Sequence, residues 1–242
     1  TCPENHSQED VKRIGGFHFQ DGFINAYSIW DNNYRPACDD PRGMVRSHNG
    51  IWVDIYLTNT TPDLLGTSAY NAQITDGNSH PKVPFKFGGN GATQYDNFTQ
   101  FTANEVLAAF GKRLPTYSEF QIFALGSKTG HAAASDPVKT KFDKDSRSMI
   151  GCEQVSGHMY QWLDGVWDRG NGSSGYNWFD ANTNGKGQIF CTGDQSVGSP
   201  LAGGYWSNGS VVGSSCADFN AECWSFTDSI GSRGVCDHMN LS

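Results

Sequence analysis

The side chains with the widest chemical reach in this sequence are its seven cysteines. They are scattered along the chain, at Cys2, Cys38, Cys152, Cys191, Cys216, Cys223 and Cys236. No two of them form a CxxC pair, so a zinc knuckle or a thioredoxin-like redox site is a poor interpretation. The odd number leaves at least one cysteine without a partner in the chain. A protein of 242 residues can also bury a sizeable core without disulfides. We therefore predict buried free thiols.

Seven histidines and one acidic run are the other candidates for metal or acid–base chemistry. The run DANTNG at residues 180–185 begins like a calcium-binding loop, but Cys191 stands where the closing glutamate is required. An Asx-rich turn is the better interpretation.

The histidines include no HExxH motif and no pair at ligand spacing on one element, and His18 is expected in the core of a strand. Residues 213–215 do not supply the GxSxG turn of a nucleophilic serine, and no GxxxxGK[ST] phosphate loop occurs. The sequence thus predicts no catalytic site, no metal site and no cofactor.

The segment from Gly203 to Ser232 differs in composition from the rest of the chain. It consists largely of small polar residues, interrupted by five aromatic rings: Tyr205, Trp206, Phe219, Trp224 and Phe226. Adaptable hydrogen-bonding residues combined with rigid aromatic anchors are typical of antibody-like recognition surfaces. A Gly/Ser-rich structural loop has the same composition. Composition alone therefore leaves both interpretations open.

Two short helices are the best-specified elements that could position this segment. In the first, Thr102 and Glu105 have the spacing of a capping box and Gly111 is placed to end the helix. Its apolar face is formed by Val106, Leu107 and Phe110.

The second helix repeats the pattern a few residues later. Pro115 precedes a capping box of Thr116 and Glu119, and Gly126 is placed to end the helix. Its buried stripe is formed by Phe120, Phe123 and Ala124. Two short amphipathic helices of this kind are expected to pack on one face of a sheet.

The remaining chain reads as short strands joined by long ordered loops. Strands are expected at residues 14–19, 51–57, the end of 155–162 and near 234–236, and loops at 58–97 and 127–146. Residues 1–13 are polar and are interpreted as a flexible lead-in. We find no internal repeat and no linker composition, so residues 14–242 are predicted to form a single α+β domain.

Charge and hydropathy exclude several classes of partner. The formal net charge is −8 and no cluster of Lys and Arg is visible, which argues against nucleic acid. No apolar run approaches the length needed to span a bilayer. The chain starts at Thr1 without a signal peptide and without Met, and we expect it to be trimmed from something longer.

Several motifs in combination resemble the formylglycine-generating-enzyme branch of the C-type lectin fold. GKRLPTYSEF at residues 111–120 resembles its helix signature, and VSGHMYQW at 155–162 resembles its SGNVWEW strand. GGYWSNG at 203–209 and GSRGV at 231–235 are similar to its ending. In detail the chain resembles the variable proteins that retroelements diversify in phages and bacteria, on segments such as IGGFH at 14–18 and FGGNG at 87–91. The resemblance extends from Ile14 to Met239.

This resemblance implies a C-type lectin fold whose variable, ligand-binding region lies at about residues 203–235. In that family adenines of a template are randomised, so that AAY codons become variable positions and never encode Trp or Glu. Trp206, Glu222 and Trp224 are therefore expected to be scaffold. The permitted positions, which we predict to contact the ligand, are Tyr205, Ser207, Ser210, Val211, Val212, Ser215, Cys216, Asp218, Phe219, Asn220, Cys223, Ser225, Phe226, Asp228 and Ser229.

The function implied is recognition of a protein or glycan on a target surface, by a phage tail structure or from a bacterial cell surface. A larger assembly through a missing N-terminal region is also expected. Two alternatives fit the motifs less well. A copper oxidase of the formylglycine-generating type needs a cysteine pair with a four-residue gap, whereas six residues separate Cys216 from Cys223. A calcium-dependent sugar-binding lectin needs EPN or QPD and WND motifs, which are absent. Fold alone decides between none of these functions.

Overall fold

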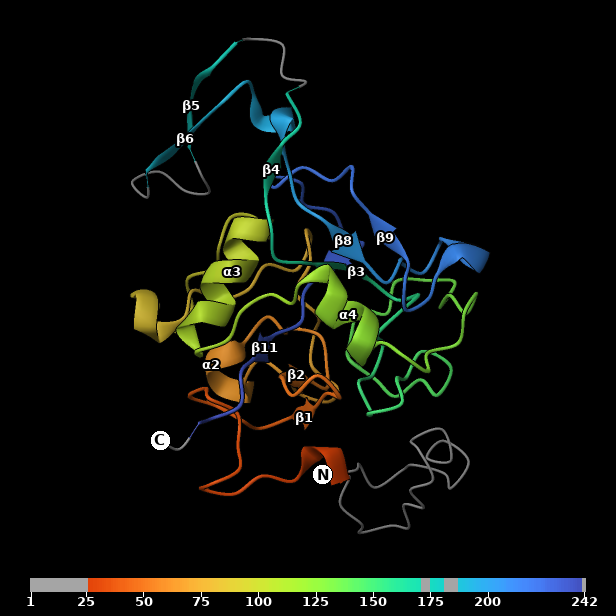
Figure 1. Cartoon of the computed structure of the whole chain (residues 1–242). Helices are drawn as coiled ribbons and strands as arrows, with labels where there is room; N and C mark the ends of the chain where they lie inside the picture. Colours follow the sequence, from red (N-terminus) through yellow and green to blue (C-terminus); the bar gives the residue numbers. More distant parts are fainter. Residues whose placement is uncertain (1–25, 171–174, 181–186, 241–242) are drawn as a thin grey trace.

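The computed structural model describes residues 26–170, 175–180 and 187–240. The predicted lead-in at 1–13, the predicted strand at 14–19 and most of the acidic run at 180–185 lie outside these residues. The model has few helices and small sheets, as predicted for the α+β class (Figure 1).

The first predicted helix is α3, Gln100–Ala109, and it begins earlier than expected. The prediction placed the cap at Thr102, which is wrong. Thr99 has extended backbone angles and accepts a hydrogen bond from the Thr102 amide at 3.3 Å, so Thr99 is the cap and Thr102 lies buried within the helix. Glu105, the expected partner in the capping box, instead accepts a hydrogen bond from the Tyr95 hydroxyl.

The second predicted helix, α4, spans Tyr117–Phe123 and begins as predicted. The Thr116 side chain accepts from the Glu119 amide, and the Glu119 carboxylate accepts from the Thr116 amide, which completes the capping box. Phe120 and Phe123 are buried, which confirms the predicted stripe.

Two small sheets carry the core. The first has the order β1-β2-β11 and is antiparallel throughout, with Val53 opposite both Val45 and Val235. The second has the order β10-β3-β8-β9; its β3–β10 pair is parallel and its other pairs are antiparallel. The strands are β1 Met44–Arg46, β2 Trp52–Asp54, β3 Tyr160–Trp162, β8 Leu201–Ala202, β9 Ala217–Asp218, β10 Ile230–Gly231 and β11 Val235–Cys236. The strand predicted at 51–57 is thus shorter than expected.

The other elements are short and lie in the connections. A hairpin of β5 and β6 projects from the body beyond the pair of β4 and β7, at the top of Figure 1. These strands are β4 Trp167–Asp168, β5 Asn177–Asp180, β6 Gln188–Cys191 and β7 Val197–Gly198. The remaining helical turns are α2 Pro62–Leu65, η1 Ala26–Ser28, η2 Phe85–Phe87, η3 Asp194–Ser196 and η4 Gly209–Val211. No helix in the described ranges is long and apolar enough to cross a membrane.

Each of the two main helices packs on strands through its own apolar cluster. α4 contributes Phe120 and Phe123 to a cluster that contains Val53. α3 contributes Leu107 to a second cluster with Trp162. Burial of large apolar side chains is the main favourable term in folding, so these two clusters fix the helices on the strands. The helices pack through separate clusters and not together on one face of a single sheet as expected.

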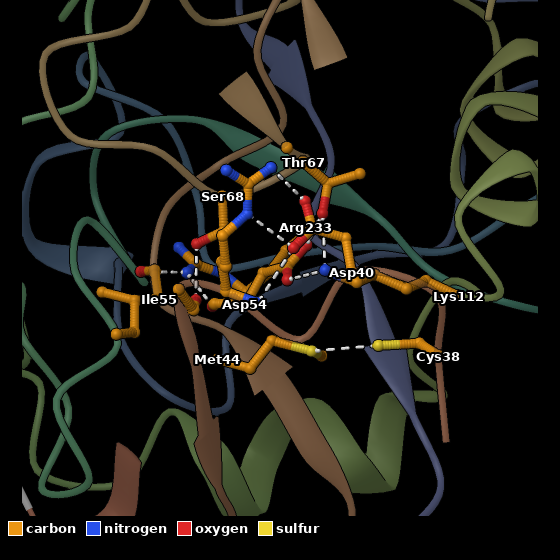
Figure 2. Close-up of polar contacts among 12 residues, drawn as sticks. Cys38, Asp40, Met44, Asp54, Ile55, Thr67, Ser68, Lys112 and Arg233 are labelled. Atoms are coloured by element: carbon orange, nitrogen blue, oxygen red, sulfur yellow. Dashed lines mark hydrogen bonds and ion pairs between the residues drawn. The ribbon is translucent and has the colours of Figure 1, made fainter. Parts of the chain in front are cut away.

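Buried charges join the two sheets beneath these clusters (Figure 2). The Lys112 ammonium lies 2.6 Å from Asp54 Oδ1 and donates to the Thr67 hydroxyl at 2.7 Å, and both charged side chains are fully buried. The Arg233 guanidinium donates to the backbone carbonyls of Asp54 and Glu153 at 2.7 and 2.6 Å. A buried charge is stable only when it is paired and fully hydrogen-bonded, which these contacts provide.

The cysteines of the described residues are free thiols, as predicted. Five of them are buried and only Cys216 is partly exposed.

Candidate functional site

The predicted variable segment, which we call the tail and define as residues 203–235, is fixed at both ends. It leaves the second sheet after β8, rejoins it at β9 and again at β10, and ends in β11 of the first sheet. Arg233 lies just before β11, and its Nε donates to Gln161 Oε1 of β3 at 3.0 Å. The two ends of the tail are therefore held by the buried core.

Two glycines allow the tail to leave β8 in close contact with the core. Gly203 and Gly204 have φ values of 90° and 74°, a region in which residues with a Cβ are strained. A Cβ on Gly203 would lie 2.8 Å from the carbonyl oxygen of Val155, and one on Gly204 would lie 2.7 Å from Val212. Any larger residue at either position would have to displace its surroundings.

The three residues expected to be scaffold pack against the body, in line with that expectation. The partly buried Trp206 packs on the cluster of Leu57, Ile74 and Met159. Trp224 packs edge-on against Phe101 of α3, with ring centroids 5.1 Å apart. Glu222 lies 3.5 Å from the guanidinium of Arg169.

The residues predicted to contact the ligand differ in exposure. Eight are exposed: Ser207, Ser210, Val211, Ser215, Phe219, Asn220, Phe226 and Asp228. Five are half-buried: Tyr205, Cys216, Asp218, Ser225 and Ser229. Val212 and Cys223 are fully buried.

Two aromatic rings of the tail, Phe219 and Tyr205, pack against rings from other segments of the chain. Phe219 is 55% exposed, and its ring packs edge-on against Tyr117 at 5.6 Å and near Trp167 at 6.2 Å. Tyr205 lies 5.6 Å from the ring of Tyr160. Rigid rings with few rotatable bonds supply contact area at a low entropic cost.

The backbone of the tail is held by side chains from elsewhere in the chain. The Tyr117 hydroxyl donates to the carbonyl oxygen of Ser215 at 2.9 Å. Arg169 donates to the carbonyl oxygen of Asn220, also at 2.9 Å. Sequence reasoning missed these supporting residues, because nothing in the local pattern links them to the tail. It also missed Thr227, which is exposed between two predicted positions.

The pKa values of Tyr160 beside the tail and of two tail cysteines are raised. Burial, together with the nearby Cys216 and Asp218, raises the pKa of the Tyr160 phenol to about 12. Burial raises the pKa of Cys223 to about 12, and burial and Asp218 raise the pKa of Cys216. Thiols rather than thiolates are poor nucleophiles and poor copper ligands.

Comparison with known proteins gives a consistent result. No protein-family model matches this sequence. The chain is 34% identical to the tail fiber receptor-binding protein of Bordetella phage BPP-1 over 267 residues, covering 100% of this chain and 67% of that protein.

Solved structures of the Major Tropism Determinant share the same fold. The U1 and P3c variants are each 36% identical and superpose with a TM-score of 0.82 over 95% of this chain. The M1 variant is 34% identical with the same TM-score. The chain spans 61% of the length of these structures. It therefore has the C-type lectin fold of the Major Tropism Determinant and belongs to the family of the Bordetella phage tail fiber receptor-binding protein.

Proposed function

We propose that this protein is a hypervariable ligand-binding protein that recognises a receptor on a target surface as part of a phage tail. Its contact surface consists of the eight predicted contacts that are exposed, flanked by the five that are half-buried. Val212 and Cys223 are left out of this surface, because a fully buried side chain cannot touch a ligand without a rearrangement of the fold.

The observation that carries the proposal is the contrast between a fixed backbone and exposed side chains in the tail. Arg233, the two glycines after β8 and the tryptophans hold the backbone. The exposed positions between them make few contacts that the fold depends on. Such a surface can change its side chains without changing its shape, which is what a diversified binding site needs.

Recognition is expected to centre on Phe219 and Phe226, which are 55% and 47% exposed. Aromatic side chains in the middle of an interface often contribute most of the binding free energy. Asp228 is exposed and adds a charge that favours one ligand over another. The ligand is a protein or a glycan, since the net charge of −8 disfavours nucleic acid.

We further propose that the tail is diversified by adenine-directed mutagenesis and that the protein is not an enzyme. The full burial of Cys223 and the six residues that separate it from Cys216 support the second statement. Sequencing the neighbouring DNA tests the first: we expect a near-identical repeat that differs from the tail only at adenines, next to a reverse transcriptase. A repeat with mismatches at all four bases would contradict it.

Binding is tested with the fluorescently labelled chain on a panel of intact bacterial strains, measured by flow cytometry. We expect saturable binding to a subset of strains, and at least about a tenfold loss for Phe219→Ser or Phe226→Ser, the size of effect typical of a central aromatic contact. The matched control is Phe85→Ser, because Phe85 is 59% exposed but lies outside the tail.

The proposal fails if both tail variants bind like the parent chain. It also fails if Phe85→Ser loses binding to the same degree, because the binding surface would then lie elsewhere.

A further inference from the structure

A cluster of two histidines and two aspartates lies directly behind the tail. His131, Asp143 and Asp145 each offer a ligand atom, and these atoms all lie within 4.8 Å of one another. His131 Nε2 is 2.8 Å from Asp143 Oδ2. His158, from the segment that leads into β3, approaches the same oxygen with its Nε2 at 3.3 Å.

His158 is the member of this cluster that points to a ligand. Its side chain is fully buried, and its Nε2 makes no hydrogen bond of good geometry. Its other ring nitrogen, Nδ1, lies 3.3 Å from the carbonyl oxygen of Ser156, which can only accept a hydrogen bond. We therefore assign the proton to Nδ1, which leaves a lone pair on Nε2 facing a carboxylate oxygen. Two such acceptors repel each other unless a second proton on the imidazole or a metal ion lies between them, and metal binding distinguishes the two cases.

The donors also suit one particular class of cation. Imidazole nitrogens and carboxylate oxygens bind Zn²⁺ and similar divalent ions, and a backbone carbonyl that fixes the tautomer of a histidine ligand is a common outer contact. With metal–ligand bonds of about 2.1 Å, neighbouring donors in a tetrahedral site are about 3.4 Å apart. The two histidine nitrogens lie 2.8 and 3.3 Å from Asp143 Oδ2, close to this spacing, and His158 would have to move towards His131 and Asp145 to complete the site.

The Asp143 carboxylate is held in one orientation by its surroundings. Its other oxygen, Oδ1, accepts a hydrogen bond from the Asp145 amide at 3.0 Å, which orients the carboxylate. The loop that carries it is close-packed on the His158 segment: a Cβ on Gly157 would lie 2.0 Å from the carbonyl oxygen of His131.

We propose that His131, Asp143, Asp145 and His158 form a binding site for one divalent transition-metal ion of the zinc class. No sequence motif indicates this site, because the ligands come from separate turns of a long loop and from a segment thirteen residues further on, and not from one helix.

The ion would join this loop to the base of the tail. His158 forms a parallel bridge with Tyr205, and its carbonyl accepts from the amide of Trp206 at 3.2 Å. From the loop itself, the amide of Gly130 donates to the carbonyl of Val212 at 2.9 Å. The proposed metal site is therefore structural: it would stabilise the backbone at the base of the tail and would not contact the receptor that the tail binds.

The test uses the full chain after treatment with a chelator, titrated with Zn²⁺ alone in a calorimeter. We expect one equivalent to bind, and His131→Asn or Asp145→Asn to weaken binding by at least about tenfold. Both residues are partly exposed, so these variants should fold even if substitution of the buried His158 does not. The matched control is His80→Asn, because the His80 ring contacts only the carbonyl of Gly77 among the described contacts.

Substitution of Co²⁺ for Zn²⁺ distinguishes this site from the cysteines. We expect visible absorption bands without the near-ultraviolet charge-transfer band of a thiolate ligand, and no change in Cys216→Ser. The proposal is overturned by an absence of saturable binding, by equal affinity in the His131 and Asp145 variants, by an equal loss in His80→Asn, or by a thiolate band that Cys216→Ser removes.

Discussion

Val211 and Val212 are neighbours of the same residue type in opposite environments. Val211 is 66% exposed, whereas Val212 is fully buried beside Gly204. We expect Val212→Ala to lower the free energy of unfolding by about 2 kcal/mol, because it leaves a cavity in the base of the tail. Val211→Ala should change it by less than about 0.5 kcal/mol. Urea denaturation of both variants measures the difference.

Equal losses of stability in the two variants would mean that packing of Val212 does not stabilise the tail.

The two valines also show the limit of sequence reasoning for single residues. Both valines satisfy the codon rule that selected the predicted contacts, and the segment that holds them is an irregular 3₁₀ turn with no period to separate inside from outside. The three rings among the predicted contacts are Tyr205, Phe219 and Phe226, which we expected to act as anchors; the structure exposes the two phenylalanines and leaves Tyr205 half-buried.

At the scale of elements, Arg233 is the contact on which the end of the tail depends. Its guanidinium donates to the backbone carbonyls of Asp54, Ile55 and Glu153 and to Gln161. Arg233→Met removes all four of these hydrogen bonds from the core and should lower the free energy of unfolding by about 3–5 kcal/mol. Arg42→Met is the control: its side chain is 65% exposed, and the loss should stay below about 1 kcal/mol. Thermal and chemical unfolding of the two variants tests this, and similar losses would contradict it.

The capping box of α4 makes stability depend on pH. Burial opposes ionisation of Glu119, but its contacts with Arg113 and Thr116 prevail and lower its pKa from 4.5. A lowered pKa adds stability above pH 4.5, and this stability is lost as the pH falls through the value in the folded protein.

Replacement of Glu119 by Gln should therefore cost about 1 kcal/mol at pH 7 and progressively less below pH 4.5, because Arg113 is 38% exposed and solvent weakens the pair. Urea unfolding of the parent and the variant between pH 7 and pH 3.5 measures this. The control is Asp237→Asn, since Asp237 also faces Arg113 but is 77% exposed. A difference between parent and Glu119→Gln that grows towards acid pH would contradict the assignment.

The elements differ in how far they could be predicted, and the reasons are physical. α4 was predicted with its cap because one threonine and one glutamate stand at the required spacing. α3 offers threonines at both 99 and 102, and the structure uses the first, whose backbone is extended. The strands have two to four residues each, which is too short for an alternating pattern to develop. Their pairing is set instead by contacts between distant segments, such as β11 on β2.

At the scale of the whole molecule, folding and recognition should be separable. Five of the eight exposed predicted contacts are not serine: Val211, Phe219, Asn220, Phe226 and Asp228. A variant with serine at all five should lose less than about 2 kcal/mol of unfolding free energy, because exposed and distant sites act nearly independently. It should nevertheless lose binding to every strain that the parent chain recognises. Calorimetric melting together with flow cytometry checks both parts, and a collapse of the fold would show that the tail is part of the core.

The two fixed ends of the tail have a consequence for how binding strength can evolve. Since the backbone between Gly203 and Arg233 is already ordered, a ligand meets a loop whose conformational entropy was lost on folding. Differences in affinity among variants then reflect side-chain chemistry, and each new variant begins from the same preorganised state. Successive substitutions at well-separated exposed positions should add their effects, so that selection can improve a weak binder one position at a time.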